Sequence, residues 1–369
     1  MIIGASAAGL AVARCLQRRG VSFVLLEKKH SVAETWRNRY DRLHLHTSKG
    51  LSALPDRPFD AHVPKYPARD EVVAYLEVYA REFGLQPRFG QEVVNLRRHP
   101  KGWQALTGDD RYLADKVVIA TGYAQKPHRP SWERMEAFGG EVLHSAQYKN
   151  GARFAGQDVL VVGCGNSGAE IALDLWEHGA RPAISVRGAV HVVPRDLLGI
   201  PILTWSIVLS RLPLRLADLL SAPLIGASIG DLSRYGLRRP AYGPLTQIAK
   251  RRRIPLIDVG TVNAIKRGGI AVRPSIAAFT PTGVRFVDDR TQRFDAVILA
   301  TGYRPGIADF LEEATDVLDR HGDPRVSDAE SRLPGLYFCG FYVSPAGMLH
   351  EISAEAPRIA GAICSSYAV

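Results

Sequence analysis

The order of apolar and polar positions predicts that the chain opens with a strand, a tight turn, a helix and a second strand. Residues 2–3 are apolar, residues 4–9 are rich in glycine, and residues 10–19 have a helical pattern. A β-type run at 23–26 follows and ends in Glu27. This order is that of the βαβ unit of a dinucleotide-binding fold.

The same order recurs in the second half of the chain. The apolar run 159–162 leads into a glycine turn at 163–168, a helical stretch reaches Trp176, and the run 183–186 ends in Arg187. Two copies of the unit predict an α/β fold with two Rossmann-like dinucleotide-binding domains.

Glycine is required in these turns for physical reasons. The first glycine permits the tight turn, the middle one lets backbone approach a pyrophosphate, and the last lets helix and strand pack closely. The pyrophosphate then binds at the N–H groups of the helix N-terminus. The turn residues are Gly4, Ser6 and Gly9 in the first copy and Gly163, Gly165 and Gly168 in the second. Such turns also occur without a ligand, but two copies in the same context favour two nucleotide sites.

The residues that end the second strands distinguish the two cofactors. An acid at this position accepts hydrogen bonds from a free ribose 2′-hydroxyl, so Glu27 favours FAD. A guanidinium pairs with a 2′-phosphate, so Arg187 favours NADPH. The alternative for Arg187 is a surface arginine at a strand end.

A second repeated element follows each unit. The runs 116–123 and 296–303 both end in Ala-Thr-Gly-Tyr, after an apolar β-type stretch. We interpret them as strands that return to each sheet and bring a small-residue turn close to the nucleotide. The expected map is an FAD-binding domain over 1–150, an NADPH-binding domain over 155–290, and a return to the first domain over 291–369. The return includes the run 335–341 and a final helix.

Charge and cysteine content exclude several classes of protein. The net charge is +10, but its densest arginine clusters, 238–239 and 251–253, lack interleaved aromatic residues, so no nucleic-acid binding is expected. The four cysteines are far apart, which argues against a disulfide framework, a metal site and a dithiol centre. A reducing cytoplasm is the expected location.

No segment of the chain is predicted to enter a membrane. No basic region precedes the first glycine turn, so no signal peptide is expected. The most apolar stretch, 197–210, is shorter than the roughly 18–20 residues that a membrane-spanning helix needs. We interpret residues 197–230 as a helical insert on the second domain; a substrate lid or a membrane-touching patch is the alternative.

Residues 138–148 match the signature Phe-x-Gly-x-x-x-His-x-x-x-Tyr at every fixed position. Together with both glycine turns, this motif makes almost the whole chain resemble the flavin-containing monooxygenase family, the class B flavoprotein monooxygenases. The stretches 36–46, 243–245 and 257–260 resemble the plant YUCCA type and its bacterial relatives most closely. The Baeyer–Villiger class is less favoured, because its signature usually ends in Trp where this chain has Tyr148.

The resemblance implies a mechanism and a set of cofactor-binding residues. NADPH reduces FAD, O2 adds to form a C4a-hydroperoxide, and one oxygen atom passes to a small substrate. Residues expected to hold FAD are Gly4, Ser6, Gly9, Glu27, Trp36, Arg37 and Thr121. Residues expected to hold NADPH are Gly163, Gly165, Asn166, Ser167, Gly168 and Arg187. Further cofactor contacts are expected from Leu43, His44, Thr47, Gly122, Thr301, Gly302, Tyr303 and Gly340.

The resemblance also suggests one catalytic residue. Many family members have an asparagine three residues before the lysine that matches Lys49, where this chain and YUCCA-type sequences have histidine. His46 is therefore expected to face the flavin; otherwise it is a hydrogen-bonded packing histidine. His144 and Tyr148 belong to the signature, which implies a structural link between domains and no proton transfer.

The sequence leaves several functions open. The oxygen could pass to a nitrogen or sulfur centre, or to a 2-oxo acid such as indole-3-pyruvate with loss of its carboxylate. An FAD and NADPH oxidoreductase without oxygen transfer, such as a reductase or an NADPH oxidase, is the alternative. A disulfide reductase lacks its dithiol, and a non-catalytic redox sensor would show no turnover. A homodimer is possible.

Overall fold

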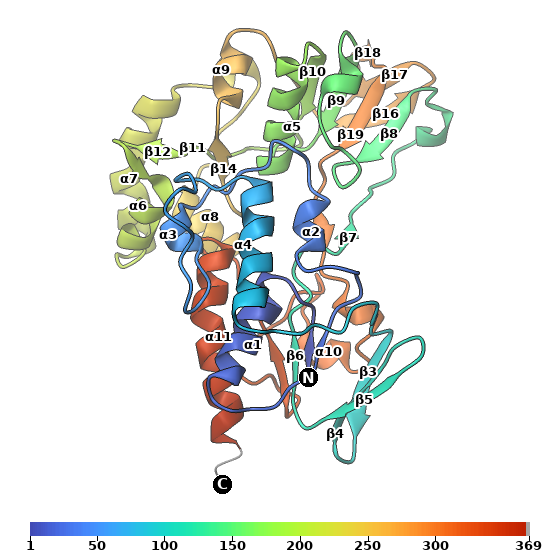
Figure 1. Ribbon diagram of the computed structural model, residues 1–369. Helices are drawn as coiled ribbons and strands as arrows, with labels where there is room; N and C mark the ends of the chain where they lie inside the picture. The colour runs from blue at the N-terminus through green and yellow to red at the C-terminus, as the bar shows by residue number, and fades with distance from the viewer. Residues whose placement is uncertain (367–369) are drawn as a thin grey trace.

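The computed structural model describes residues 1–366 and contains two α/β domains (Figure 1). The first domain holds a four-stranded parallel sheet in the order β2-β1-β6-β21. Its strands are β1 (Ile2–Ile3), β2 (Leu25–Leu26), β6 (Val117–Ile119) and β21 (Leu336–Phe338). β1 contains only two residues.

Alternate side chains of this sheet enter different cores. Ile2 and Val118 pack with helices on one face, whereas Ile3 and Ile119 pack with Trp103 on the other. The helices are α1 (Ala7–Gln17), α4 (Arg69–Glu82) and α11 (Met348–Ser365). The opposite layer is the antiparallel sheet β3 (Asn95–His99), β4 (Gly102–Leu106) and β5 (Arg111–Ala114). Successive side chains of a strand point to opposite faces of its sheet. The strands of the parallel sheet are therefore apolar at consecutive positions, because both faces are buried.

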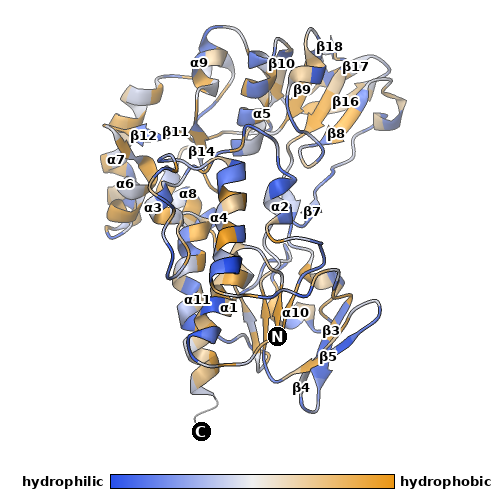
Figure 2. Ribbon diagram, viewed as in Figure 1, coloured by the Kyte–Doolittle hydropathy of each residue, from blue (hydrophilic) through white to orange (hydrophobic). Residues whose placement is uncertain are grey.

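The second domain repeats this layering around a five-stranded parallel sheet in the order β15-β10-β9-β19-β8. Its strands are β8 (Glu141–His144), β9 (Asp158–Val162), β10 (Arg181–Ser185), β15 (Ala271–Arg273) and β19 (Ala296–Leu299). Helices α5 (Asn166–Glu177) and α9 (Thr261–Lys266) pack on one face. An antiparallel sheet of β16 (Ile276–Thr280), β17 (Gly283–Phe286) and β18 (Thr291–Arg293) covers the other. In Figure 2 much of the parallel sheet is orange, as a sheet buried on both faces requires.

The pairing of β8 and β19 corrects the expected domain boundaries. The limits 155 and 290 leave both strands in the first domain, but they pair with each other and with β9 in the second sheet. The chain therefore enters the second sheet before residue 150 and leaves it after residue 290. Strand pairing over this distance has no local sequence signal, which explains the error. The return of β21 and α11 to the first domain follows the expected map; residues 367–369 of that segment lie outside the described residues.

The insert at 197–230 is helical, and its buried residues join the core of the second domain. Its helices are α6 (Ile202–Leu209) and α7 (Leu214–Ile229), which lie beside α8 (Pro244–Arg251). Short strands connect it: β11 (Val192–Pro194), β12 (Asp196–Leu197), β13 (Ile200–Pro201) and β14 (Leu256–Asp258). Within residues 1–366 no helix is both long and apolar enough to cross a membrane.

The two domains are joined by chain crossings and by side chains. Strand β7 (Lys126–Pro127) pairs antiparallel with β20 (Tyr303–Arg304) where the chain passes between them. Short helices α2 (Glu34–Arg37), α3 (Lys49–Ser52) and α10 (Ala314–Val317) complete the first domain. This arrangement places the carboxyl ends of the strands, and the segment 38–68, near the boundary between the domains (Figure 1).

Candidate cofactor and catalytic site

The first glycine turn has the geometry that its sequence predicts. Gly4 has a φ of 104°, and a Cβ there would lie 2.6 Å from the carbonyl oxygen of Ala120. A Cβ on Gly9 would lie 1.8 Å from the carbonyl oxygen of Gly4. Ser6 precedes α1 in extended backbone and makes no capping hydrogen bond with its side chain. The turn therefore presents the N-terminus of α1 and a free hydroxyl at the end of β1.

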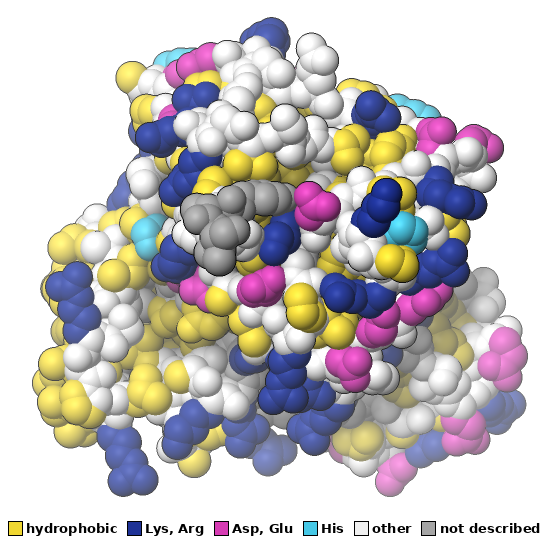
Figure 3. Space-filling model, turned by 90° about the horizontal axis from the view of Figure 1, so that it is seen from below, with side chains coloured by type: hydrophobic (Ala, Val, Ile, Leu, Met, Phe, Trp, Pro, Cys, Tyr) yellow, Lys and Arg dark blue, Asp and Glu magenta, His cyan; other side chains and the backbone are white. Residues whose placement is uncertain are grey.

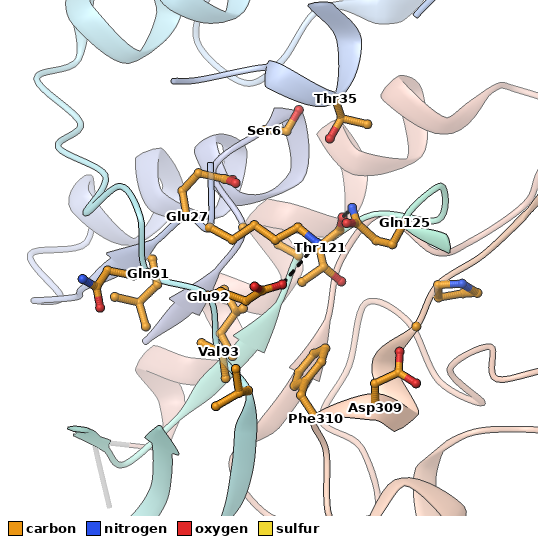
Figure 4. Close-up of a pocket in the computed structure, with 18 of the residues that line it drawn as sticks. Ser6, Glu27, Thr35, Gln91, Glu92, Val93, Thr121, Gln125, Asp309 and Phe310 are labelled. Atoms are coloured by element: carbon orange, nitrogen blue, oxygen red, sulfur yellow. Dashed lines mark hydrogen bonds and ion pairs between the residues drawn. The ribbon is translucent and has the colours of Figure 1, made fainter. Parts of the chain in front are cut away.

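A cavity of about 360 Å³ lies in front of this turn (Figure 4). Gly4, Ser6, Glu27 and Thr121, which are among the residues predicted to hold FAD, line it. The backbone N–H of Ala5 donates to Oε2 of Glu27 at 2.7 Å, and that of Lys29 donates to Oε1 at 3.0 Å. These two bonds fix the carboxylate and leave lone pairs on both oxygens for ribose hydroxyls.

Thr121 gives a second indication of a ligand in this cavity. Its Oγ1 is buried and has no hydrogen-bond partner within residues 1–366. Buried hydroxyls are usually bonded, so this oxygen fits a cofactor atom in the cavity. The helix N-terminus, the Thr121 hydroxyl and the fixed carboxylate of Glu27 together suit the pyrophosphate and ribose of a dinucleotide.

Other lining residues were not expected from the sequence. They come from helix α2, which contributes Thr35, and from loops that carry no motif, which contribute Lys28, Gln91, Glu92, Val93, Gln125 and Phe310 (Figure 4). Lys28 and Glu92 form an ion pair of 3.8 Å beside the cavity. No local pattern marks these positions, because only the folded loops bring them to the end of the sheet.

The remaining residues expected to bind the first cofactor lie outside this lining. Arg37 pairs with Glu77 at 2.5 Å on the surface, and His44 is exposed, with Nδ1 2.7 Å from the carbonyl oxygen of Arg42. Thr47 bonds to the hydroxyl of Ser52 at 2.6 Å. The others pack in the cores or at turns: Trp36, Leu43, Gly122 and Gly340.

The second glycine turn repeats the geometry of the first. Gly163 has a φ of 112°, and a Cβ there would lie 2.6 Å from the carbonyl oxygen of Ala300. A Cβ on Gly168 would lie 2.0 Å from the carbonyl oxygen of Gly163, whereas a Cβ on Gly165 would meet no atom within 4 Å. The space before Gly165 is therefore open to a ligand.

Side chains around the second turn have distinct roles. Asn166 Oδ1 accepts the backbone N–H of Ile257 at 2.8 Å, so it ties the turn to β14. Ser167 lies within hydrogen-bonding reach of Tyr40. Arg187 is exposed beyond β10 and forms no ion pair or hydrogen bond with the residues that the structure describes. Its guanidinium is available to an anionic ligand.

The second Ala-Thr-Gly-Tyr turn is held by the signature segment. Thr301 Oγ1 donates to the carbonyl oxygen of His128 at 2.5 Å. The ring of Tyr303 lies edge-on to His144 at 5.0 Å, and the guanidinium of Arg39 lies 4.5 Å from its centre. Gly302 accepts from His144 through its carbonyl oxygen at 3.1 Å. Through Arg39, these contacts connect the first domain to the turn that follows β19.

His144 has no nitrogen left for proton transfer. The N–H of Ala146 donates to Nδ1 at 3.1 Å, so Nε2 carries the hydrogen that bonds to Gly302. Burial lowers the pKa of His144 to about 4, against the effect of the Gly302 carbonyl. Tyr148 donates to Asp174 at 2.5 Å, and burial and this carboxylate raise the pKa of its hydroxyl. Both side chains therefore have a structural role, through the hydrogen bonds that they make.

His46 lies at the contact of the two domains. Its Nε2 is 2.8 Å from Oε1 of Glu170 on α5, and Tyr40 donates to Oε2 of the same carboxylate at 3.2 Å. The side chain of Glu170 is only 4% exposed, and that of His46 is 17% exposed. Nδ1 of His46 is buried and has no hydrogen-bond partner among the described residues.

This geometry leaves one ring nitrogen of His46 open. Nε2 lies at ion-pair distance from Oε1 of Glu170 but makes no hydrogen bond with it, so Nδ1 of His46 and Oε1 of Glu170 are both buried without a hydrogen-bond partner within residues 1–366. Burial raises the pKa of Tyr40 well above its usual value, and the charge of Glu170 raises it further. Glu170 was not expected from the sequence. The sequence feature that could have indicated it is a single acid within the otherwise apolar helical stretch 169–173.

The cysteines do not form a redox centre in residues 1–366. Cys15, Cys164 and Cys339 are buried, and all four thiols are free. Burial raises the pKa of Cys15 to about 11 and that of Cys164 to about 12. Buried thiols with a raised pKa are poor nucleophiles.

Comparison with known proteins agrees with this geometry. The family described as flavin-binding monooxygenase-like matches residues 1–321. Indole-3-pyruvate monooxygenase YUCCA1 of Oryza sativa subsp. japonica is 42% identical over 348 residues, which cover 92% of this chain and 86% of that protein. The YUCCA4 enzyme of the same plant is 41% identical over 360 residues, covering 92% and 82%.

Solved structures share the fold. A flavin-containing monooxygenase from Stenotrophomonas maltophilia is 26% identical, with a TM-score of 0.74 over 100% of this chain and 98% of that one. An open crystal structure of cyclohexanone monooxygenase, 18% identical, matches 100% of this chain and 87% of its own with a TM-score of 0.75. The chain therefore belongs to the flavin-binding monooxygenase-like family, and it is a flavoprotein monooxygenase with two nested Rossmann-like domains.

Proposed function

We propose that the flavin is FAD, that NADPH reduces it, and that the substrate is an aromatic 2-oxo acid such as indole-3-pyruvate. The fixed carboxylate of Glu27 supports FAD, and the free guanidinium of Arg187 supports the 2′-phosphate of NADPH. The identity of about two fifths with enzymes named for indole-3-pyruvate supports the substrate class.

The atoms and electrons of the proposed reaction balance with O2 and NADPH as the co-substrates. The 2-oxo acid, O2, NADPH and a proton give the carboxylic acid one carbon shorter, CO2, NADP⁺ and water. The bond between the keto carbon and the carboxylate breaks, and one oxygen atom enters the product. The bound flavin supplies the oxygen chemistry, while the chain binds and orients the cofactors and excludes water.

His46 is the residue that we propose to place beside the flavin. Its Nδ1 is buried without a hydrogen-bond partner, and its Nε2 lies 2.8 Å from Oε1 of Glu170. Nδ1 would hold a proton near the reacting centre. For His46→Ala we expect unchanged flavin content and reduction by NADPH, but at least a tenfold faster decay of the oxygenated flavin signal. His62→Ala, which alters an exposed histidine, serves as the control.

The test of the function is a two-step rapid-mixing experiment. The flavin-loaded protein is reduced with NADPH without oxygen and then mixed with oxygenated buffer while the flavin spectrum is followed. We expect a transient species, distinct from oxidised and reduced flavin, that decays faster with indole-3-pyruvate and releases CO2. Oxygen transfer to amines or sulfides without CO2 would identify the other substrate class. Direct reoxidation without a transient would support an NADPH oxidase instead.

A further inference from the structure

A second cavity, of about 200 Å³, lies in the helical insert between α6, α7 and α8. Apolar side chains form most of its wall, among them Leu203, Leu224 and Ile248. Ser206 and Ser221 are the only hydroxyl-bearing residues in its lining. It is separate from the cavity in front of the first glycine turn, since the two share no lining residue.

The polar groups of this wall are already satisfied. Ser206 donates to the carbonyl oxygen of Ile202 at 2.9 Å, and Ser221 donates to that of Asp218 at 3.1 Å. The indole N–H of Trp205 donates to the carbonyl oxygen of Leu197 at 3.1 Å. Because no side-chain donor in the lining is free, the cavity favours an apolar group and rejects a charged one.

The size of the cavity suits a small aromatic ring system. An engineered apolar cavity of about 150 Å³ remains dry and binds benzene. Atoms that line an empty cavity lack dispersion partners on one side, so a flat apolar ligand would restore those contacts. A ring of this kind fits, whereas a carboxylate attached to it must remain outside.

The cavity touches the first domain at its inner end. Pro345, one of its lining residues, lies in the loop between β21 and α11. Two residues later, a Cβ on Gly347 would lie 2.4 Å from Cγ2 of Thr47, so this loop packs against the segment that contains His46. The loop follows the carboxyl end of β21, and dinucleotides bind along this edge of such sheets.

Other contacts hold the insert in place at this boundary. Lys65 Nζ and the hydroxyl of Tyr66 both bond to Oδ1 of Asp196, at 2.6 and 2.7 Å. The guanidinium of Arg195 lies 4.4 Å from the ring centre of Tyr66. The outer end of the cavity is reached through α7, where Leu220 and Leu224 are 50% and 42% exposed. Figure 3 shows hydrophobic side chains gathered on the left, the side on which Figure 1 places α6 and α7.

From this geometry we propose that the insert cavity binds the aromatic ring of the substrate. The ring lies between α6, α7 and α8 and enters from the Pro345 side, and the 2-oxo acid end stays at that side, where the two domains meet. The assignment of a 2-oxo acid rests on the proposed function, whereas the ring site rests on the cavity itself. The insert would thus select aromatic substrates over small ones.

The experiment measures binding of indole, the ring without its acid, to the oxidised flavin-loaded protein without NADPH. Ser206→Phe fills the cavity, and Ser210→Phe places the same ring on the exposed end of α6, outside the lining. Isothermal titration should show at least a tenfold weaker Kd in Ser206→Phe and less than a twofold change in Ser210→Phe. Leu224→Trp, with Leu219→Trp as its control, repeats the test should Ser206→Phe fail to fold.

Measurements of substrate turnover distinguish a failure of the ring site from a failure of the proposed function. In Ser206→Phe, the ratio of kcat/KM for indole-3-pyruvate to that for pyruvate should fall at least tenfold. If the parent protein oxidises indole-3-pyruvate but the filling variants keep its Kd for indole, the ring site is wrong and the function stands. If no 2-oxo acid is oxidised but filling abolishes indole binding, the ring site stands and only the substrate class fails.

Two further outcomes would overturn the ring site. One is an absence of indole binding to the parent protein at millimolar concentration. The other is an unchanged indole affinity in the filling variants together with a loss of self-association or of vesicle binding. That result would mean that the insert cavity takes part in one of those two interactions instead. Sedimentation of the same protein samples, alone and with anionic vesicles, distinguishes these occupants.

Discussion

The two glycine turns of this protein share their backbone and differ at the strand ends. Gly4 and Gly163 approach the carbonyl oxygens of Ala120 and Ala300 to the same distance, 2.6 Å for a Cβ at either position. By contrast, Glu27 is fixed by two backbone N–H groups, whereas Arg187 extends freely into solvent. The shared backbone fits the proposal that each turn binds a pyrophosphate, and the different strand ends fit the proposal that each site takes a different nucleotide.

The two turns also differ in what lies in front of them. The first turn faces a cavity with an unsatisfied hydroxyl, Thr121, while the space before Gly165 is open.

The largest expected effect comes from alanine at the last glycine of each turn. Gly9→Ala and Gly168→Ala place Cβ within 2.0 Å of a carbonyl oxygen, so backbone must move, at a cost of about 3 kcal/mol or more. We expect Gly9→Ala to lose flavin, and Gly168→Ala to keep flavin but resist reduction by NADPH. Flavin absorbance and urea unfolding measure both effects.

The matched control is Gly226→Ala, because this helical glycine has nothing within 4 Å of its Cβ position. It should be neutral or slightly stabilising. Equal loss of flavin in Gly9→Ala and Gly168→Ala would contradict the division of roles between the turns.

His144 should make stability depend on pH, because it bonds the second Ala-Thr-Gly-Tyr turn. Its pKa is lowered to about 4 by burial, below the ordinary value of 6.5. Its contribution is therefore complete above about pH 6.5 and is lost as the pH falls towards 4, by at most about 3 kcal/mol. Urea unfolding from pH 7 to 4 should be less pH-dependent in His144→Gln. An identical pH slope in both proteins would refute this contribution.

Arg187→Ala should separate the two nucleotides. Loss of a charge-assisted bond to a 2′-phosphate costs about 2 kcal/mol, so the KM for NADPH should rise tens of times. The KM for NADH should change less than threefold, since NADH lacks that phosphate. Arg181→Ala, at the other end of β10, is the control. A proportional rise for both nucleotides would exclude Arg187 as the selective residue.

The smallest expected effect is that of Ser6→Gly, which makes the first turn identical in pattern to the second. Ser6 precedes α1 without a capping bond, so stability should change by only a few tenths of a kcal/mol, as at other helix N-caps. The Kd for flavin, measured by reconstitution, should stay within about threefold. A larger loss would mean that the hydroxyl binds the pyrophosphate directly.

Sequence reasoning succeeded where chemistry depends on neighbouring residues. The turn geometry of Gly4 and Gly163 and the repeated layering follow from local patterns. It failed at the strands β8 and β19, whose pairing joins segments about 150 residues apart in sequence. It also missed the loop residue Gln91, because loops that line a cavity carry no periodic signal.

The sequence by itself determined the two nucleotide folds, because a glycine that would collide with a carbonyl if it carried a Cβ is a local requirement. It also determined the opposite charges at the ends of the second strands. Only the tertiary structure decided that His46 meets Glu170 and that α6, α7 and α8 enclose a cavity beside Pro345. Contacts between domains depend on how whole surfaces pack, and that information is distributed over the chain rather than written in any one motif.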